Sequence, residues 1–243
     1  MKIDRNKKNP MRKAFGQTFA QIGAVNEKIV VMDADLACST QTKIFAEKFP
    51  NRFFDCGIAE QDMVATAAGL ASQGKIPFAA SFAVFATGRT YDQIRNAICY
   101  PKFNVKIIGT HGGITVGEDG ATHQALEDVA LMRNLPNMTV IVPADSKECE
   151  EAVKFAAEHD GPVYIRVARS SVPDIFDNTY KFNPLHAVIT KEGKDISIFT
   201  NGETLAECLL AAEELEKEGI SAEVINIPVV KPLDTKTVIE SVS

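Results

Sequence analysis

The sequence lacks the patterns that mark membrane, secreted and metal-binding proteins. No window holds the ~18 consecutive apolar residues that a membrane-spanning helix requires. The charged first nine residues have neither the apolar run nor the small-residue cleavage site of a signal peptide. The five cysteines are odd in number, widely spaced and without a CxxC pair, so they predict reduced thiols rather than zinc or redox chemistry. We therefore expect a cytoplasmic protein.

A surplus of basic residues and the common nucleotide-binding motifs are also missing. The 26 Lys and Arg are outnumbered by 32 Asp and Glu, whereas nucleic-acid-binding proteins need excess positive charge to displace phosphate counterions. Neither a Walker loop nor a GxGxxG motif occurs. What remains is 243 residues, 45% hydrophobic and 24% charged, which is typical of a globular protein with one large domain or one and a half smaller ones.

Strand and helix patterns alternate along most of the chain. Apolar runs predict strands at 29–32, 76–80, 105–109, 139–142 and 163–167, and the intervening periodicity predicts helices at 11–26, 61–72, 90–99, 123–134 and 146–159. Fully apolar strands that alternate with helices indicate an α/β fold, a parallel sheet with helices on both faces. In such sheets ligands bind beyond the carboxyl ends of the strands.

A second, smaller α/β unit follows a break in this rhythm. We assign residues 1–172 to the first domain, the Pro- and Asn-containing stretch 173–190 to a linker, and 191–243 to the second domain. The second domain shows strands at 196–199 and 222–227 and helices at 204–218 and from 234. One βαβ unit and one further helix cannot protect both faces and edges of a sheet, so we expect this domain to be incomplete.

Two segments concentrate polar residues where a parallel sheet binds ligands. The stretch from His111 to Gln124 holds four glycines, two histidines and two acidic residues directly after a predicted strand. Glycines alone indicate a turn, but this density of titratable groups favours a binding or catalytic site. Glu60 lies at a strand-to-helix junction, where a glutamate is often only favourable with the helix dipole. The small residues that follow Glu60 would let a ligand approach closely.

Two pairs of residues allow more than one interpretation. Phe82 and Phe85 follow a predicted strand, and their spacing alone favours ordinary core residues. Arg166 and Arg169 follow another strand and fit either a phosphate site or isolated surface arginines, because a guanidinium fork matches phosphate oxygens.

Taken together, these stretches resemble transketolase, specifically the half that binds the aminopyrimidine ring of thiamine diphosphate. The motifs that carry the resemblance are Met11-Arg12-Lys13-Ala14, Ala34-Asp35-Leu36, Ile58-Ala59-Glu60-Gln61-Asp62, Ser81-Phe82-Ala83-Val84-Phe85, Tyr91-Asp92-Gln93-Ile94-Arg95, the block from Gly117 to Gln124 with Glu127 and Asp128, the stretch Arg166 to Arg169, and Lys231-Pro232-Leu233-Asp234. They occur in family order over nearly the whole chain. The resemblance implies a pyrimidine-binding domain for 1–172 and part of the transketolase C-terminal domain for 191–243.

The resemblance implies a role for each matching residue. Glu60 would hydrogen-bond a ring nitrogen of the aminopyrimidine, which requires a largely buried acid that can hold a proton. The other residues expected near the cofactor are Phe82, Phe85, Ile58 and Asp35, of which Asp35 also lies near the subunit contact. Asp119 and His123 would contact sugar hydroxyls and assist proton transfer. The residues expected to hold the sugar phosphate are Arg12, Ser39, His111 and Arg169.

The resemblance also implies a partner chain. Full-length relatives hold the diphosphate and its metal through a Gly-Asp-Gly motif followed by Asn, and nothing here matches that pattern. We therefore expect Mg²⁺ (or Ca²⁺) to be held by a separate diphosphate-binding N-terminal transketolase subunit, with no metal ligand from this chain. The expected assembly is a heterotetramer that self-associates across the cofactor site and acts on sugar phosphates of the pentose phosphate pathway. Gly88 is an apparent extra residue, which leaves open whether Tyr91 is the third aromatic of the pocket.

Three alternatives stay open at this point. Deoxyxylulose-phosphate synthase and the β subunit of a 2-oxo-acid dehydrogenase share the fold and the cofactor. The run Gly117-Glu118-Asp119-Gly120 followed by His123 fits transketolase better, because a ketose donor needs several polar partners for its hydroxyls. From another class, the chain could be a non-catalytic, truncated interaction subunit.

Overall fold

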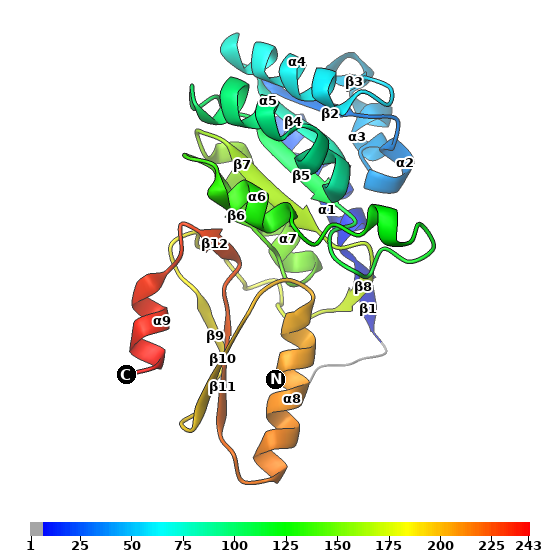
Figure 1. Ribbon diagram of the computed structural model, residues 1–243. Coiled ribbons are helices and arrows are strands. Elements are labelled where there is room, and N and C mark those ends of the chain that lie inside the picture. Colours follow the sequence, from blue (N-terminus) through cyan, green and yellow to red (C-terminus); the bar gives the residue numbers. More distant parts are fainter. Residues whose placement is uncertain (1–6) are drawn as a thin grey trace.

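The computed structural model describes residues 7–243, so the first six residues of the expected first domain lie outside it. Its main sheet has seven strands in the order β12-β6-β7-β5-β4-β2-β3, with helices on both faces (Figure 1). All neighbouring strands are parallel except β12, which pairs antiparallel with β6 at one edge. A smaller sheet of order β10-β11-β9 forms the second unit. The α/β class with a parallel sheet is confirmed.

The secondary structure of the larger unit follows the chain from β1 to β8. Its elements are β1 (Lys8–Pro10), α1 (Met11–Val25), β2 (Ile29–Asp33), α2 (Ala37–Thr40), α3 (Lys43–Lys48), η1 (Pro50–Arg52), β3 (Phe53–Asp55), α4 (Glu60–Ser72), β4 (Ile76–Phe82), η2 (Val84–Arg89), α5 (Tyr91–Gln93), η3 (Ile94–Cys99), β5 (Lys106–Thr110), η4 (Ala121–His123), α6 (Asp128–Asn134), β6 (Thr139–Ile141), α7 (Ser146–Glu158), β7 (Val163–Val167) and β8 (Ser171–Pro173). The remaining elements are β9 (Val188–Lys191), β10 (Ile196–Thr200), α8 (Thr204–Lys217), β11 (Ala222–Asn226), β12 (Val229–Lys231) and α9 (Thr235–Ser241).

Two hydrophobic cores cover the two faces of the main sheet. Successive side chains of a strand point to opposite faces, so Val31 and Phe78 join the core of α1, α3 and α7, whereas Met32 and Ala79 join that of α4, η3 and α6. Because both faces are buried, the strands carry apolar residues at consecutive positions. Within residues 7–243, no helix is long and apolar enough to cross a membrane.

The helix predicted at 123–134 is wrong over residues 124–127, since His123 ends the short 3-10 helix η4. Helix α6 begins only at Asp128. In the stretch before α6, Ala125 forms an isolated parallel β-bridge with Gly112. The Ala125 carbonyl accepts a hydrogen bond from the Gly113 N–H at 2.8 Å. The Ala125 carbonyl also accepts from Arg166 Nη2, at 3.3 Å. These long-range contacts outweigh the local helical pattern.

Part of the predicted linker is strand. β8 pairs antiparallel with β1, and β9 pairs antiparallel with β11. β12, which the sequence analysis did not predict as a strand, leaves the second unit to extend the main sheet. These short strands form through pairing with distant segments rather than through a strong local pattern.

The helix predicted at 90–99 consists of the short helix α5 followed by the π-helical segment η3. A second π-helix, η2, precedes it and carries Phe85. π-helical turns are rare and often occur at functional sites. Phe82 is the last residue of β4, so the two phenylalanines belong to different elements.

Candidate active site

The predicted site residues gather at the carboxyl edge of the main sheet. Phe82 ends β4, His111 directly follows β5, and Arg169 follows β7 by two residues. These strands are neighbours in the sheet and run parallel, so their carboxyl ends meet at one edge (Figure 1).

An aromatic cluster of two phenylalanines and two histidines forms the centre of this edge. The Phe82 and Phe85 rings are stacked, with centroids 6.0 Å apart. The His111 ring stacks on Phe82 at 3.8 Å, and the His123 ring meets Phe85 edge-on at 5.2 Å. Phe82 and Phe85 are therefore not merely packed in the core, because both contact polar side chains of the glycine-rich segment.

Glu60 is the first residue of α4 and is 4% exposed, so it meets the burial that its expected role requires. Its carboxylate is not free in this chain. Arg89 Nη1 lies 3.0 Å from one carboxylate oxygen and 3.2 Å from the other. The Arg89 guanidinium also lies over the Phe85 ring, with its central carbon 4.0 Å from the ring centroid. Sequence reasoning missed Arg89, for which the only signal was its place in the segment that carries Phe85.

Arg12, His111 and Arg169 form a cluster of positively charged and hydrogen-bond-donor groups, which we call the cation cluster. Arg12 Nη1 donates to the Ser39 carbonyl at 2.7 Å and lies 3.5 Å from His111 Nε2, while the buried Arg12 Nε has no hydrogen-bond partner among residues 7–243. Burial and then the charges of Arg12 and Arg169 lower the pKa of His111 to about 3. Burial and then Arg169 lower the pKa of Arg12. Like charges held together with an unused donor fit an anionic ligand such as a phosphate.

The segment after β2, which carries Asp35 and, in α2, Ser39, is organised by a buried carboxylate that sequence reasoning missed. Asp33, at the end of β2, accepts hydrogen bonds from the Leu36 N–H at 2.6 Å and from two threonine hydroxyls, Thr40 at 2.7 Å and Thr42 at 2.8 Å. Burial raises the pKa of Asp33 to about 6. Asp35 is exposed, and its N–H donates to Asp55 Oδ1.

Arg166 joins the glycine-rich segment to a buried carboxylate. Arg166 Nε lies 3.1 Å from the fully buried Asp128 carboxylate, which also accepts a 2.7 Å hydrogen bond from Tyr164. A Cβ on Gly112 would lie 2.2 Å from Arg166 Nε, so glycine is needed for this close approach. Arg166 is therefore not an isolated surface arginine, and its part in a phosphate site stays a prediction. Arg169 forms no ion pair with a carboxylate in the described part of the chain and remains in the cation cluster.

Two expected residues, Asp119 and Ile58, and the open candidate Tyr91 stay at the margin of the site or outside it. Asp119 is exposed in the glycine-rich segment and makes no hydrogen bond within residues 7–243. Ile58 is 77% exposed just before α4. Tyr91 packs against the core, and its hydroxyl accepts a hydrogen bond from Asn134 at 3.2 Å, so it is not part of the aromatic cluster.

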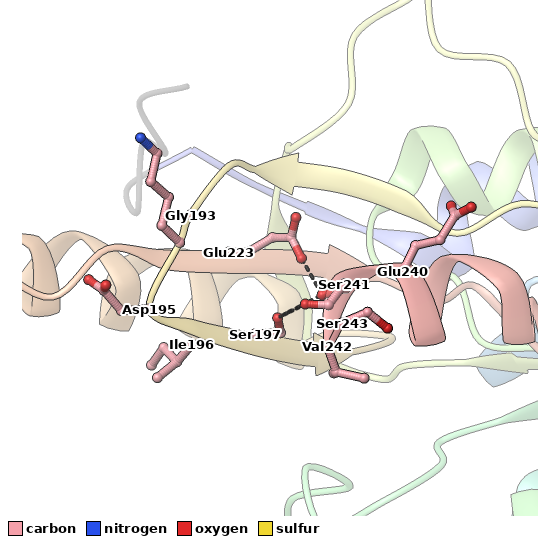
Figure 2. A pocket seen from close by; sticks show the side chains of 10 residues that line it. Gly193, Asp195, Ile196, Ser197, Glu223, Glu240, Ser241, Val242 and Ser243 are labelled. Atoms are coloured by element: carbon pink, nitrogen blue, oxygen red, sulfur yellow. Dashed lines mark hydrogen bonds between the residues drawn. The ribbon is translucent and has the colours of Figure 1, made fainter.

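A separate cavity of about 590 Å³ lies in the second unit, between the β9–β10 turn, β11 and the end of the chain (Figure 2). Its polar groups bond one another: the Ser241 hydroxyl contacts both Ser197 and Glu223. It shares no residue with the aromatic or cation clusters, so we do not assign the active site to it.

The comparisons with known proteins agree with this geometry. Residues 7–174 match the family model for the transketolase pyrimidine-binding domain, and residues 185–243 match that for the transketolase C-terminal domain. A putative transketolase C-terminal section from Methanocaldococcus jannaschii is 48% identical over 95% of this chain and 74% of its own length. A 6-deoxy-6-sulfo-D-fructose transketolase subunit from a Clostridium species is 42% identical over 95% and 72%.

Solved structures give the same result. A split-gene transketolase, described as an inactive β4 tetramer, superposes with a TM-score of 0.89 at 51% identity, over 97% of this chain and 76% of that one. Transketolase from Campylobacter jejuni superposes with a TM-score of 0.86 at 27% identity, over 96% and 37%. The chain belongs to the transketolase family. The resemblance to its pyrimidine-binding section is confirmed.

Proposed function

We propose that the chain is the pyrimidine-binding subunit of a split transketolase and transfers a two-carbon ketol unit from a ketose phosphate to an aldose phosphate. The observation that carries the proposal is the convergence at one sheet edge of a stacked aromatic pair, a buried carboxylate and the cluster of Arg12, His111 and Arg169. Family membership supports thiamine diphosphate as the cofactor. When bound, it supplies the nucleophilic carbon for cleavage beside the ketose carbonyl.

The residues at this edge fit such a ligand. Phe82 and Phe85 provide an aromatic wall, and Glu60 presents a buried carboxyl group beside it, which would hydrogen-bond a ring nitrogen. Arg12 and Arg169 would orient the sugar phosphate, because guanidinium groups bind phosphate oxygens in a planar fork.

The remaining expected residues complete the proposal. His111, neutral because of its lowered pKa, and Ser39 of α2 would line the phosphate site. His123 and Asp119 would bind sugar hydroxyls and move protons. Exposed Ile58 and Asp35 would be covered by cofactor and a second copy.

The same proposal includes a cytoplasmic heterotetramer with a diphosphate-binding subunit that holds Mg²⁺. The β4 tetramer of the split-gene relative supports self-association, and its description as inactive supports the need for another chain.

The test is a coupled ketol-transfer assay with xylulose 5-phosphate and ribose 5-phosphate, in the presence of thiamine diphosphate and Mg²⁺. The chain is assayed alone and mixed with the diphosphate-binding subunit from the same source, and we expect activity only in the mixture. A proven complex that transfers no ketol unit would refute catalysis and favour a non-catalytic interaction subunit. Pyruvate as donor tests the deoxyxylulose-phosphate synthase alternative, and 6-deoxy-6-sulfofructose tests the substrate named for the Clostridium relative.

A Glu60→Ala variant tests the mechanism in the same complex. We expect it to abolish turnover while the fold is retained, since α4 begins at Glu60 but its core residues are unchanged. Undiminished turnover would remove Glu60 from the mechanism.

A further inference from the structure

The Arg89 side chain fills the space between Glu60 and Phe85. Its Nη1 atom contacts both oxygens of the Glu60 carboxylate, at 3.0 and 3.2 Å, and its guanidinium carbon lies 4.0 Å from the Phe85 ring centroid. One flat, nitrogen-rich group thus stacks on an aromatic ring and hydrogen-bonds a buried carboxylate at the same time.

Glu60 and Phe85 are the groups that the proposed function, on which this inference rests, assigns to the aminopyrimidine ring. A guanidinium and an aminopyrimidine ring are alike in shape: both are planar, and both would place a nitrogen atom against Glu60. The guanidinium donates its N–H to the carboxylate, whereas the ring nitrogen would accept a hydrogen bond from the carboxyl group. A ring that stacks on Phe85 and reaches Glu60 needs the space that the guanidinium fills. The two groups therefore compete for one site.

We propose that Arg89 is an internal placeholder that occupies the pyrimidine site of the free chain and is displaced when the cofactor binds. Without the Arg89 guanidinium, the Glu60 carboxylate would be a buried, unpaired charge. The Arg89–Glu60 ion pair therefore stabilises the free chain until the cofactor replaces the guanidinium.

The surroundings of Arg89 permit this exchange. The Arg89 side chain is 50% exposed and can turn into solvent. Its backbone carbonyl accepts a 2.8 Å hydrogen bond from Gln61 Nε2, which keeps the end of η2 beside α4. At Gly88 a Cβ would meet no atom within 4 Å, so nothing crowds this turn. Displacement thus requires a side-chain rotation and no change of fold.

Only chains in which Arg89 has left the site can bind the cofactor, so the apparent Kd is the intrinsic Kd divided by the fraction of open sites. If Arg89 closes nine sites in ten, the cofactor binds about tenfold more weakly. Arg89→Met keeps the apolar stem and removes the guanidinium. Arg95→Met is the matched control, because Arg95 is exposed nearby and its guanidinium contacts its neighbour Asn96. Arg89→Lys keeps the charge without the planar fork.

The experiment titrates thiamine diphosphate, with saturating Mg²⁺, into the complex of this chain with the diphosphate-binding subunit, and follows binding by calorimetry. We expect Arg89→Met to lower the Kd about tenfold, Arg89→Lys to fall between it and the wild type, and Arg95→Met to match the wild type. Unchanged or weaker binding by Arg89→Met, with a binding wild type, overturns the placeholder and leaves the proposed function standing. A wild-type complex that does not bind the cofactor refutes the proposed function, and the placeholder with it.

Thermal melting of the free chain tests the ion pair without any cofactor. We expect a lower Tm for Arg89→Met than for Arg95→Met. The double variant Glu60→Gln with Arg89→Met should regain the Tm of Arg95→Met, because the amide of the introduced glutamine leaves no unpaired charge. Equal Tm values for Arg89→Met and Arg95→Met would overturn the proposal that Arg89 is a placeholder.

Discussion

Arg166 lies in β7 and Arg169 follows that strand by two residues, yet their surroundings predict opposite effects of substitution. Arg166 pairs with Asp128, whose side chain is 1% exposed, whereas Arg169 lies in the cation cluster. Replacing each by methionine keeps an apolar side chain of similar length and removes the guanidinium. The pair of variants therefore separates support of the glycine-rich segment from binding of the substrate phosphate.

Removal of one partner from a buried ion pair costs about 3–5 kcal/mol. Tyr164 still donates to Asp128 in Arg166→Met, so we expect a loss of about 3 kcal/mol, at the lower end of that range. For a chain of this size that corresponds to a fall in Tm of roughly 6–12 °C. Arg169→Met relieves the repulsion with Arg12 and should leave Tm unchanged or slightly higher.

For the kinetics of ketol transfer we expect the large effect from Arg169→Met, the variant that should leave Tm unchanged. A lost hydrogen bond to a charged group costs about 1.5–3 kcal/mol, so Arg169→Met should raise the KM for xylulose 5-phosphate roughly tenfold to hundredfold. The assays are thermal melting of the free chain and ketol-transfer kinetics of the complex, with a ketose that lacks phosphate as the control donor. A fall in Tm for Arg169→Met as large as that for Arg166→Met would refute this reasoning, as would an equal loss of activity toward both donors.

Three further predictions follow from single side chains. Burial lowers the pKa of Lys106 from 10.5 to about 7. The free energy of unfolding should therefore rise with pH between about 7 and 10.5, and this gain is lost again as the pH falls toward 7. Lys106→Met should flatten this slope in thermal melts at several pH values. Burial raises the pKa of Glu148 from 4.5 to about 7, so its contribution, about 3 kcal/mol, is present below about pH 4.5 and lost as pH rises through 7. Glu148→Gln should therefore remove the slope in that lower window alone, and an unchanged slope would contradict the shift. His123→Ala should lower kcat with ketose phosphates more than it weakens cofactor binding, and the opposite pattern would count against its place on the sugar side.

Local patterns in the sequence determined the main strands and most helices. β7 has the predicted bounds, 163–167, and Glu60 begins a helix as its place at a strand-to-helix junction implied. Such elements are predictable because burial of both sheet faces leaves apolar runs, and helices show a 3.6-residue period. The same local reading placed the glycine-rich segment at the end of a strand, and parallel strands bring such ends to one edge.

The contacts that define the site were decided only by the tertiary structure. Arg89 reaches a carboxylate 29 residues away, and Arg12 lies 99 residues from His111. Local periodicity carries no information about such pairs, because they depend on which strands are neighbours in the sheet. For the same reason β9 and β12 were missed: each is a short strand that exists through its pairing partner. The sequence alone was sufficient for the family and for the sheet edge where the candidate site lies, whereas the folded chain was needed to show that Arg89 occupies the place beside Glu60.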